Sequence, residues 1–202
     1  MACAIVHPGD DSLRDRAERH PSAKATTTMH PVARTQNPTL SAEEIGKRFL
    51  KLIEGLESRN DLSVERIKEV TGITLSYVPK GERYSYGEPL GNGWYYMFWY
   101  NPESDSLKNG LSLMFINSKE EFGDMTPVCP LDFDHYHNAL VAMGFLAEPN
   151  YGEIGELRSW HYTKFKKSDG TVDMTLSIIP QNVISGEAGR LCVKSIGTLN
   201  GR

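Results

Sequence analysis

The feature that most limits how this chain can fold is a run of seven residues from Trp94 to Tyr100, six of which are aromatic. Such residues suit a pleated, half-buried surface, which predicts a β-strand. The turn-forming sequences Gly91-Asn92-Gly93 and Asn101-Pro102 predict its two ends. Because side chains alternate along a strand, the run has two faces. One face carries Trp94, Tyr96, Phe98 and Tyr100, and the other carries Tyr95, Met97 and Trp99.

Both faces of this predicted strand are apolar or amphipathic, whereas a strand at the protein surface usually has one polar face. Two arrangements are consistent with the pattern. In the first, the strand lies centrally in a sheet that is covered on both sides, since a packed core is the usual place of aromatic residues. In the second, one face is kept for a binding partner. The sequence leaves this choice open.

The chain also shows signs of an internal repeat, which can determine the architecture of a protein. The tripeptide Tyr-Gly-Glu occurs at residues 86–88 and again at 151–153, and each copy precedes a Trp-x-Tyr sequence, at Trp94 and at Trp160. Each copy also follows a predicted helix that ends at a glycine, Gly72 or Gly144. The repeat predicts two units, at about residues 40–118 and 119–199, each with a helix followed by antiparallel strands.

Local signals place the remaining elements. Ser41 and Glu44 fit a capping box before an apolar helical pattern that extends to about Glu57. Residues 79–93 are rich in Gly, Pro and Tyr, which predicts a loop around a short extended piece at residues 84–87. In residues 171–178, the apolar side chains Val172, Met174, Leu176 and Ile178 alternate with polar ones. This alternation is typical of an antiparallel sheet with one face on a core and one in water.

These signals together predict one α+β domain over residues 40–199. Its antiparallel strands are expected to form one sheet, with helices on one face of that sheet. Residues 1–39 are predicted to be disordered or poorly ordered, because prolines recur in this segment and it contains turn-like and small polar sequences.

Composition narrows the functional classes. The chain is 39% hydrophobic and 24% charged, which is ordinary for a globular protein, and no apolar run approaches the ~18 residues of a membrane span. The net charge is −4. An acidic domain is a poor candidate for nucleic acid, which selects basic patches. It suits a protein partner with a basic contact surface.

Cys129 and Cys192 lie near the two ends of the second predicted unit. A disulfide between them would clamp that unit and would imply an oxidising compartment, such as the periplasm or the outside of a cell. Two buried free thiols are the alternative. No signal peptide is visible in the chain, so a cytoplasmic location also remains open.

The sequence holds no strong catalytic or metal-binding motif. Asp134 and His137 are one helical turn apart and could chelate together, but a helix N-terminus also attracts aspartate for capping. Glu88 and Glu153 occupy matching repeat positions and could act as paired carboxylates, as in glycoside hydrolysis. We expect no metal and no cofactor. A small hydrolase that uses the paired carboxylates or the Asp/His site is kept as an alternative function.

A binding surface has more support in the sequence. Met97 and Trp99 of the first unit stand where Thr163 and Phe165 stand in the second, so the first unit is richer in aromatic and sulfur side chains. Such side chains are enriched at the centres of protein interfaces. We predict that the aromatic strand and the loops at its ends contact a partner. The predicted contact residues are Tyr86, Tyr95, Met97, Trp99, Glu103 and Asp105.

In architecture, tandem units of a helix followed by strands, with a disulfide across one unit, resemble small inhibitor proteins such as the beta-lactamase inhibitory protein. They also look like bacterial immunity proteins that block secreted toxins. The resemblance covers about residues 40–199 and assigns no residue roles. It implies a non-catalytic binding protein, an inhibitor or immunity protein that blocks a secreted bacterial enzyme or toxin. An envelope scaffold protein and a homodimer are the further alternatives.

Overall fold

The computed structural model describes residues 36–182 and 189–201. Most of the segment predicted to be poorly ordered, residues 1–39, therefore lies outside the described residues. Within that segment, the Asn37 side chain accepts a hydrogen bond from Thr74 N at 2.6 Å and donates one to Thr74 O at 3.0 Å. The packed fold thus begins slightly before the predicted residue 40.

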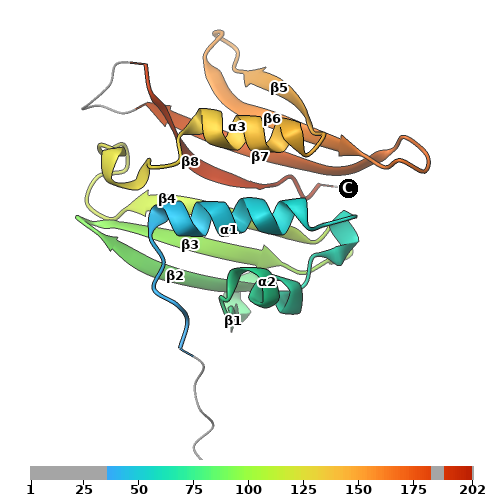
Figure 1. The fold of residues 1–202 in the computed structure, drawn as a ribbon, viewed down its shortest axis with the longest axis horizontal. Coiled ribbons are helices and arrows are strands. Elements are labelled where there is room, and N and C mark those ends of the chain that lie inside the picture. The colour runs from blue at the N-terminus through green and yellow to red at the C-terminus, as the bar shows by residue number, and fades with distance from the viewer. Residues whose placement is uncertain (1–35, 183–188, 202) are drawn as a thin grey trace, which may run out of the picture. The chain divides into compact units, whose positions relative to one another are not determined.

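All eight strands of the described chain pair antiparallel in a single sheet, with the order β1-β2-β3-β4-β8-β7-β6-β5 (Figure 1). The first half of the sheet contains β1 (Ser76–Val78), β2 (Arg83–Gly91), β3 (Trp94–Asn101) and β4 (Gly110–Asn117). The second half contains β5 (Leu146–Tyr151), β6 (Leu157–Phe165), β7 (Val172–Asn182) and β8 (Leu191–Thr198). The two halves meet where β4 pairs with β8.

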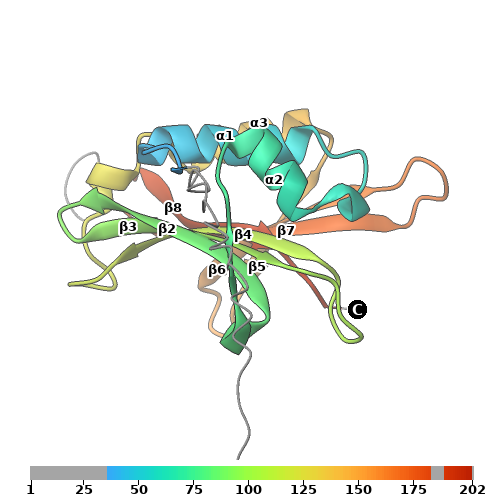
Figure 2. The same cartoon turned by 90° about the horizontal axis from the view of Figure 1, so that it is seen from below.

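Three α-helices lie on one face of the sheet in the part of the chain that the structure describes (Figure 2). They are α1 (Ala42–Glu54), α2 (Val64–Thr71) and α3 (Phe133–Ala142). The short 3-10 turns are η1 (Arg59–Asp61), η2 (Pro79–Gly81) and η3 (Thr126–Val128). The predicted α+β class and the single antiparallel sheet are confirmed. Within the described ranges, no helix is both long and apolar enough to span a bilayer.

Helix starts and stops follow the local sequence. Ser41 and Glu44 form the predicted capping box, in which Ser41 Oγ accepts from Glu44 N and the Glu44 carboxylate accepts from Ser41 N. The helix ends at Glu54, a little before the predicted Glu57. Gly72 ends α2 with φ of +74°, a backbone conformation that glycine adopts without a steric penalty.

The core lies between the helices and the face of the sheet that they cover. Helix α1 supplies one set of fully buried side chains: Ile45, Phe49, Leu52 and Ile53. The strands supply the facing set: Tyr96, Phe98, Leu113, Tyr162, Leu176 and Ile178. Burial of a single side chain of this size contributes about 1.5–3 kcal/mol, so this layer dominates the stability of the fold.

The predicted repeat is not confirmed, although the strand order is symmetric about the β4–β8 pair. The two Tyr-Gly-Glu sequences occupy different places: Tyr86 lies in the middle of β2, the second strand of its half, whereas Tyr151 is the last residue of β5, the first strand of its half. Likewise, Trp94 begins β3 while Trp160 lies in β6. The sequence match therefore does not mark equivalent positions.

Two strands differ from the prediction. Residues 83–91, predicted to be mostly loop, form β2, because its backbone pairs with β1 on one side and β3 on the other. In β7, a shift of register opposite Lys164 and Phe165 turns Val172 outward, where it is 47% exposed, and turns Asp173 inward. Asp173 is 7% exposed and accepts hydrogen bonds from Ser58 Oγ and Arg59 N.

Candidate functional site

The strand β3 divides its side chains between the core and the uncovered face of the sheet. Trp94, Tyr96, Phe98 and Tyr100 point toward the helices and are at most 8% exposed. Tyr95, Met97 and Trp99 point the other way and are half-buried. No described element covers that second face, which we call the open face (Figure 2). Of the two arrangements consistent with the sequence, a sheet covered on both sides is therefore not the one seen in the described residues.

Register defines the rest of the open face, because residues directly opposite each other in neighbouring strands point to the same side. Ser85, Gly87 and Pro89 of β2 lie opposite Trp99, Met97 and Tyr95. On the other side of β3, the same Trp99, Met97 and Tyr95 lie opposite Ser112, Met114 and Ile116 of β4. Gly87 leaves room for Met97, because a Cβ atom at position 87 would collide with the Met97 sulfur. The first half thus presents an aromatic and sulfur-rich surface.

Tyr86 does not belong to this surface, which corrects its predicted place among the contact residues. It lies opposite Phe98 and so faces the helices. Its hydroxyl donates a hydrogen bond to the Glu88 carboxylate. Burial and this carboxylate together raise the pKa of Tyr86 to about 12. Tyr86 therefore lies on the helical side of the sheet and not on the open face.

The two acidic residues predicted to contact a partner, Glu103 and Asp105, lie in the loop between β3 and β4 and are exposed. Glu103 lines a small pocket together with Arg59 and Lys108. Both residues follow the end of β3 that carries Trp99, so they lie beyond one end of the row formed by Tyr95, Met97 and Trp99. They remain candidates for the rim of a contact surface but do not form its centre.

Sequence reasoning missed Arg83, which was assigned to a loop. Arg83 begins β2 on the open face, and its guanidinium carbon lies 4.6 Å from the centroid of the Trp99 ring. This is the geometry of a cation–π contact, which holds the long side chain in one orientation. Alternation along β2 from Ser85 would have placed Arg83 beside Trp99, had the strand been recognised.

A pocket of about 400 Å³ opens on the same face, where β4, β7 and β8 meet the loop that follows β4. Its apolar walls come from Met114, Ile179 and Phe122, and the last two are 45% and 65% exposed. Lys194 lies 4.5 Å above the Phe122 ring and donates a hydrogen bond to Glu121 O. This pocket also went unnoticed in the sequence, because residues distant along the chain assemble it.

The second half of the open face combines polar pairs in its middle with exposed apolar side chains around them, namely Leu146, Phe165, Val172 and Ile179. His161 lies opposite Ser177, and Thr163 lies opposite Thr175 with 3.3 Å between their hydroxyl oxygens. Ser159 Oγ is 3.3 Å from His161 Nε2. The expected contrast between an apolar first half and a polar second half is therefore seen only in the middle of the second half, where the pairs His161–Ser177 and Thr163–Thr175 lie.

The geometry gives little support to the alternative catalytic sites. Glu88 lies on β2 and Glu153 beyond the end of β5, and these strands are separated by five others, or roughly 29 Å of sheet. Paired glycosidase carboxylates lie only about 5–9.5 Å apart. His137 Nδ1 lies 3.0 Å from Tyr162 Oη, and the His137 ring packs on Phe133 and Trp160. Among the described residues, no three metal-ligating side chains cluster.

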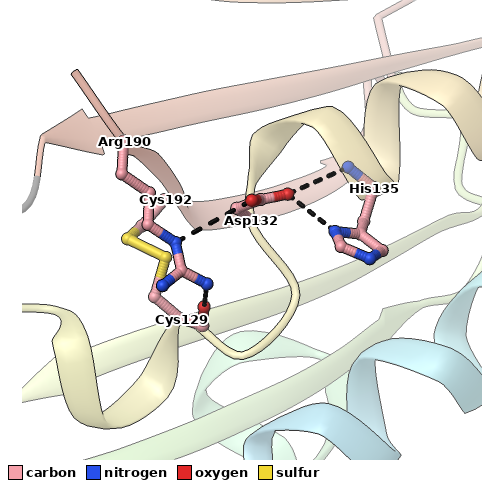
Figure 3. A network of polar contacts seen from close by, with 5 residues as sticks. All are labelled: Cys129, Asp132, His135, Arg190 and Cys192. Atoms are coloured by element: carbon pink, nitrogen blue, oxygen red, sulfur yellow. Dashed lines mark hydrogen bonds and ion pairs between the residues drawn. A yellow bond between two sulfur atoms is a disulfide. The ribbon is translucent and has the colours of Figure 1, made fainter. Parts of the chain in front are cut away.

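The predicted cysteine pair is present. Cys129 and Cys192 have their sulfur atoms 2.00 Å apart, and they join the segment before α3 to β8 (Figure 3). Arg190 donates a hydrogen bond to Cys129 O at 2.8 Å, and its Nε lies 3.8 Å from the Asp132 carboxylate. Asp132 caps α3 by accepting from His135 N at 3.1 Å. A disulfide of this kind is compatible with an oxidising compartment.

Comparison with known proteins adds no constraint to this geometry. No family model, curated protein or solved structure matches the chain. The arrangement of side chains on the open face is therefore the basis for a functional interpretation. That arrangement can bind a surface of complementary shape.

Proposed function

We propose that the protein is a non-catalytic binding protein whose open face docks onto a protein partner. The observation that carries this proposal is the uncovered, apolar first half of the sheet, built from β2, β3 and β4. Tyr95, Met97 and Trp99 are half-buried there, and Met114 and Ile116 continue the surface on β4. Aromatic side chains on a sheet provide contact area at little entropic cost, and methionine side chains adapt their shape to a partner.

The shape of the sheet suits this role. At both edges, the β1–β2 and β5–β6 hairpins bend away from the helical layer, so the open face is concave between them (Figure 2). A concave face can surround a convex part of a partner and exclude water from the contact. Exclusion of water is what makes central aromatic residues costly to remove, commonly by about 2 kcal/mol or more.

Within this class, we favour an inhibitor or immunity protein that blocks a secreted bacterial enzyme or toxin. The Cys129–Cys192 pair supports the choice, because it suits the oxidising compartments in which secreted enzymes are met. The element order that resembles inhibitor and immunity proteins supports it as well. An envelope scaffold protein is the competing member of the class, and an effect on enzyme activity distinguishes the two.

We further infer that the two halves of the sheet arose by duplication and then diverged. The symmetric strand order about β4 and β8 supports this inference. The different side chains that the two halves place in the middle of the open face fit the divergence. Superposition of residues 76–117 on 146–198 would test it, because unrelated halves should not align over all four strands.

The function is tested by affinity capture of envelope and secreted proteins with the tagged wild-type protein and two variants. Met97→Glu places a charge at the centre of the open face. Val141→Glu is the matched control, because Val141 is 46% exposed on α3, away from that face. We expect the wild type and Val141→Glu to retain one partner and to reduce its enzymatic or toxic activity, and Met97→Glu to lose both effects.

Thermal unfolding of both variants accompanies the capture experiment and shows that each is folded. Equal capture by Met97→Glu and the wild type would contradict the assignment of the contact face. Capture that depends on Met97, without any change in the activity of the captured protein, would favour the scaffold alternative.

A further inference from the structure

The contact between Arg83 and Trp99 indicates what chemistry a partner must bring. Arg83 forms no ion pair with any described residue, although its guanidinium is held over the Trp99 ring at 4.6 Å. Two N–H groups of this pair, Arg83 Nε and Trp99 Nε1, are covered from solvent and have no acceptor within the described chain. The pair therefore places a fixed positive charge at the edge of the aromatic surface, and its two covered N–H groups leave that charge without a neutralising acceptor in the described chain.

A partner that covers Met97 and Trp99 also covers this guanidinium. Removal of a charged group from water is costly unless the new surroundings supply an opposite charge or hydrogen-bond acceptors. Arg83 has no such group within the described chain, so the acceptor has to come from the partner. Arginine also binds carboxylates in a planar, two-point geometry that a backbone carbonyl cannot match.

Charges on the surrounding strands point in the same direction. The only acidic residue within β2, β3 and β4 is Glu88, and it lies opposite Tyr96 on the side of the helices. Arg83 is therefore the only charged side chain that these three strands place on the open face. At the far end of the surface, Lys194 supplies a second cation above Phe122, beside Glu121 of the same pocket.

We propose that the open face binds an acidic segment of the partner, which places an Asp or Glu carboxylate on Arg83 and an apolar side chain in the pocket between Met114, Phe122 and Ile179. This inference rests on the proposed function, and it replaces the basic contact surface that net charge alone suggests. The pocket lies about three strand spacings across the sheet and four residues along it from Arg83, or roughly 20 Å. About six extended residues span that distance.

The partner need not be identified for the first test, which is selection from a library of random peptides displayed on phage, with the intact wild-type protein as the target. Enriched peptides are synthesised, and their dissociation constants are measured for the wild type, Arg83→Gln, Met97→Glu and Val141→Glu. We expect enriched peptides to combine Asp or Glu with a large apolar residue several positions away. Their affinity should fall at least about tenfold in Arg83→Gln and in Met97→Glu, and stay unchanged in Val141→Glu.

Arg83→Lys separates charge from geometry, because lysine keeps the charge and loses the planar fork. The expected affinity of this variant lies between those of the wild type and Arg83→Gln. Enriched peptides that are basic or uncharged, or binding that is insensitive to Arg83→Gln, would overturn the proposal. Failure to enrich any peptide whose binding depends on Met97 would overturn it as well.

These outcomes are distinct from failure of the proposed function. If affinity capture depends on Met97 while the peptides fail, the open face binds a partner of different chemistry. If neither experiment depends on Met97, both proposals are wrong. Sedimentation of the wild type measures its oligomeric state, and so tests whether the open face instead binds a second copy of the chain. A dimer that dissociates in both Arg83→Gln and Met97→Glu would overturn the acidic partner segment in favour of self-association.

Discussion

At the scale of single residues, two neighbouring residues of β3 lie on opposite faces of the sheet, one in the core and one at the surface. Phe98 is fully buried beneath α1 and makes an edge-to-face contact with Phe49, with 6.1 Å between ring centroids. Its neighbour Trp99 is half-buried on the open face and contacts Arg83. Two adjacent aromatic residues should therefore respond differently to truncation.

We expect Phe98→Ala to lower the free energy of unfolding by about 3–5 kcal/mol, because it leaves a cavity in the core. Trp99→Ala should cost only about 1–2 kcal/mol, since this side chain is already partly in contact with water. Urea unfolding of both variants measures the difference. Equal losses would show that Trp99 is a structural residue and would weaken its assignment to the contact face.

Asp132 provides a prediction for pH dependence. Burial raises the pKa of its carboxyl, but hydrogen bonds from the His135 side chain and backbone lower it more, so the net pKa lies below the ordinary value of 3.8. A depressed pKa in the folded state stabilises the protein above the unfolded-state pKa. That stability is lost as the pH falls through the folded-state value.

The Asp132→Asn variant removes this titration and keeps an oxygen that can cap α3. We expect unfolding free energies between about pH 5 and pH 2 to fall less steeply for this variant than for the wild type. Identical slopes would show that the Asp132 carboxylate does not contribute to acid stability.

At the scale of elements, the sequence predicted the helices and strands whose apolar pattern is uninterrupted. The capping box at Ser41, the glycine stop at Gly72 and the alternation of residues 174–178 all correspond to observed structure. The strand β2 was missed, because its Gly87 and Pro89 resemble loop residues although both point to the open face. The inward turn of Asp173 was missed because a register shift leaves no local signal.

The disulfide acts at this scale by joining two elements. It closes a sequence separation of 63 residues between the start of α3 and β8, which in the chain-entropy model is worth about 4 kcal/mol. We expect the double variant Cys129→Ser/Cys192→Ser to unfold at a lower urea concentration than the wild type. The corresponding loss in the free energy of unfolding should be about 4 kcal/mol. A reductant that cleaves disulfides should lower the stability of the wild type but leave the stability of the variant unchanged. A variant as stable as the oxidised wild type would contradict this role.

At the scale of the whole described fold, buried Arg59 connects segments that are distant in sequence. It is 4% exposed and donates hydrogen bonds to Asn109 O, Leu199 O and Asn200 Oδ1. Such long-range bonds have no sequence signature, because each acceptor becomes a neighbour only after the chain folds. The same reason explains why the pocket at Phe122 and the pairing of Arg83 with Trp99 were not predicted.

The sequence did predict the side of β3 that carries the candidate site, because alternation alone separates Tyr95, Met97 and Trp99 from the core residues. It misplaced Tyr86, whose face depends on the register between β2 and β3. Composition suggested an acidic contact surface, but net charge averages over the chain and does not show where the charges lie. The open face of the first half instead carries Arg83.

The central claim is that this open face is the surface that a partner covers. Hydroxyl-radical footprinting of the complex with the captured partner tests it most directly, because Met and Trp side chains react readily when exposed. We expect partner binding to protect Met97, Trp99 and Met114, while Met143, which lines a groove beside α1 on the helical side, oxidises as before. Protection of Met143 with unchanged oxidation of Met97 and Trp99 would contradict the claim.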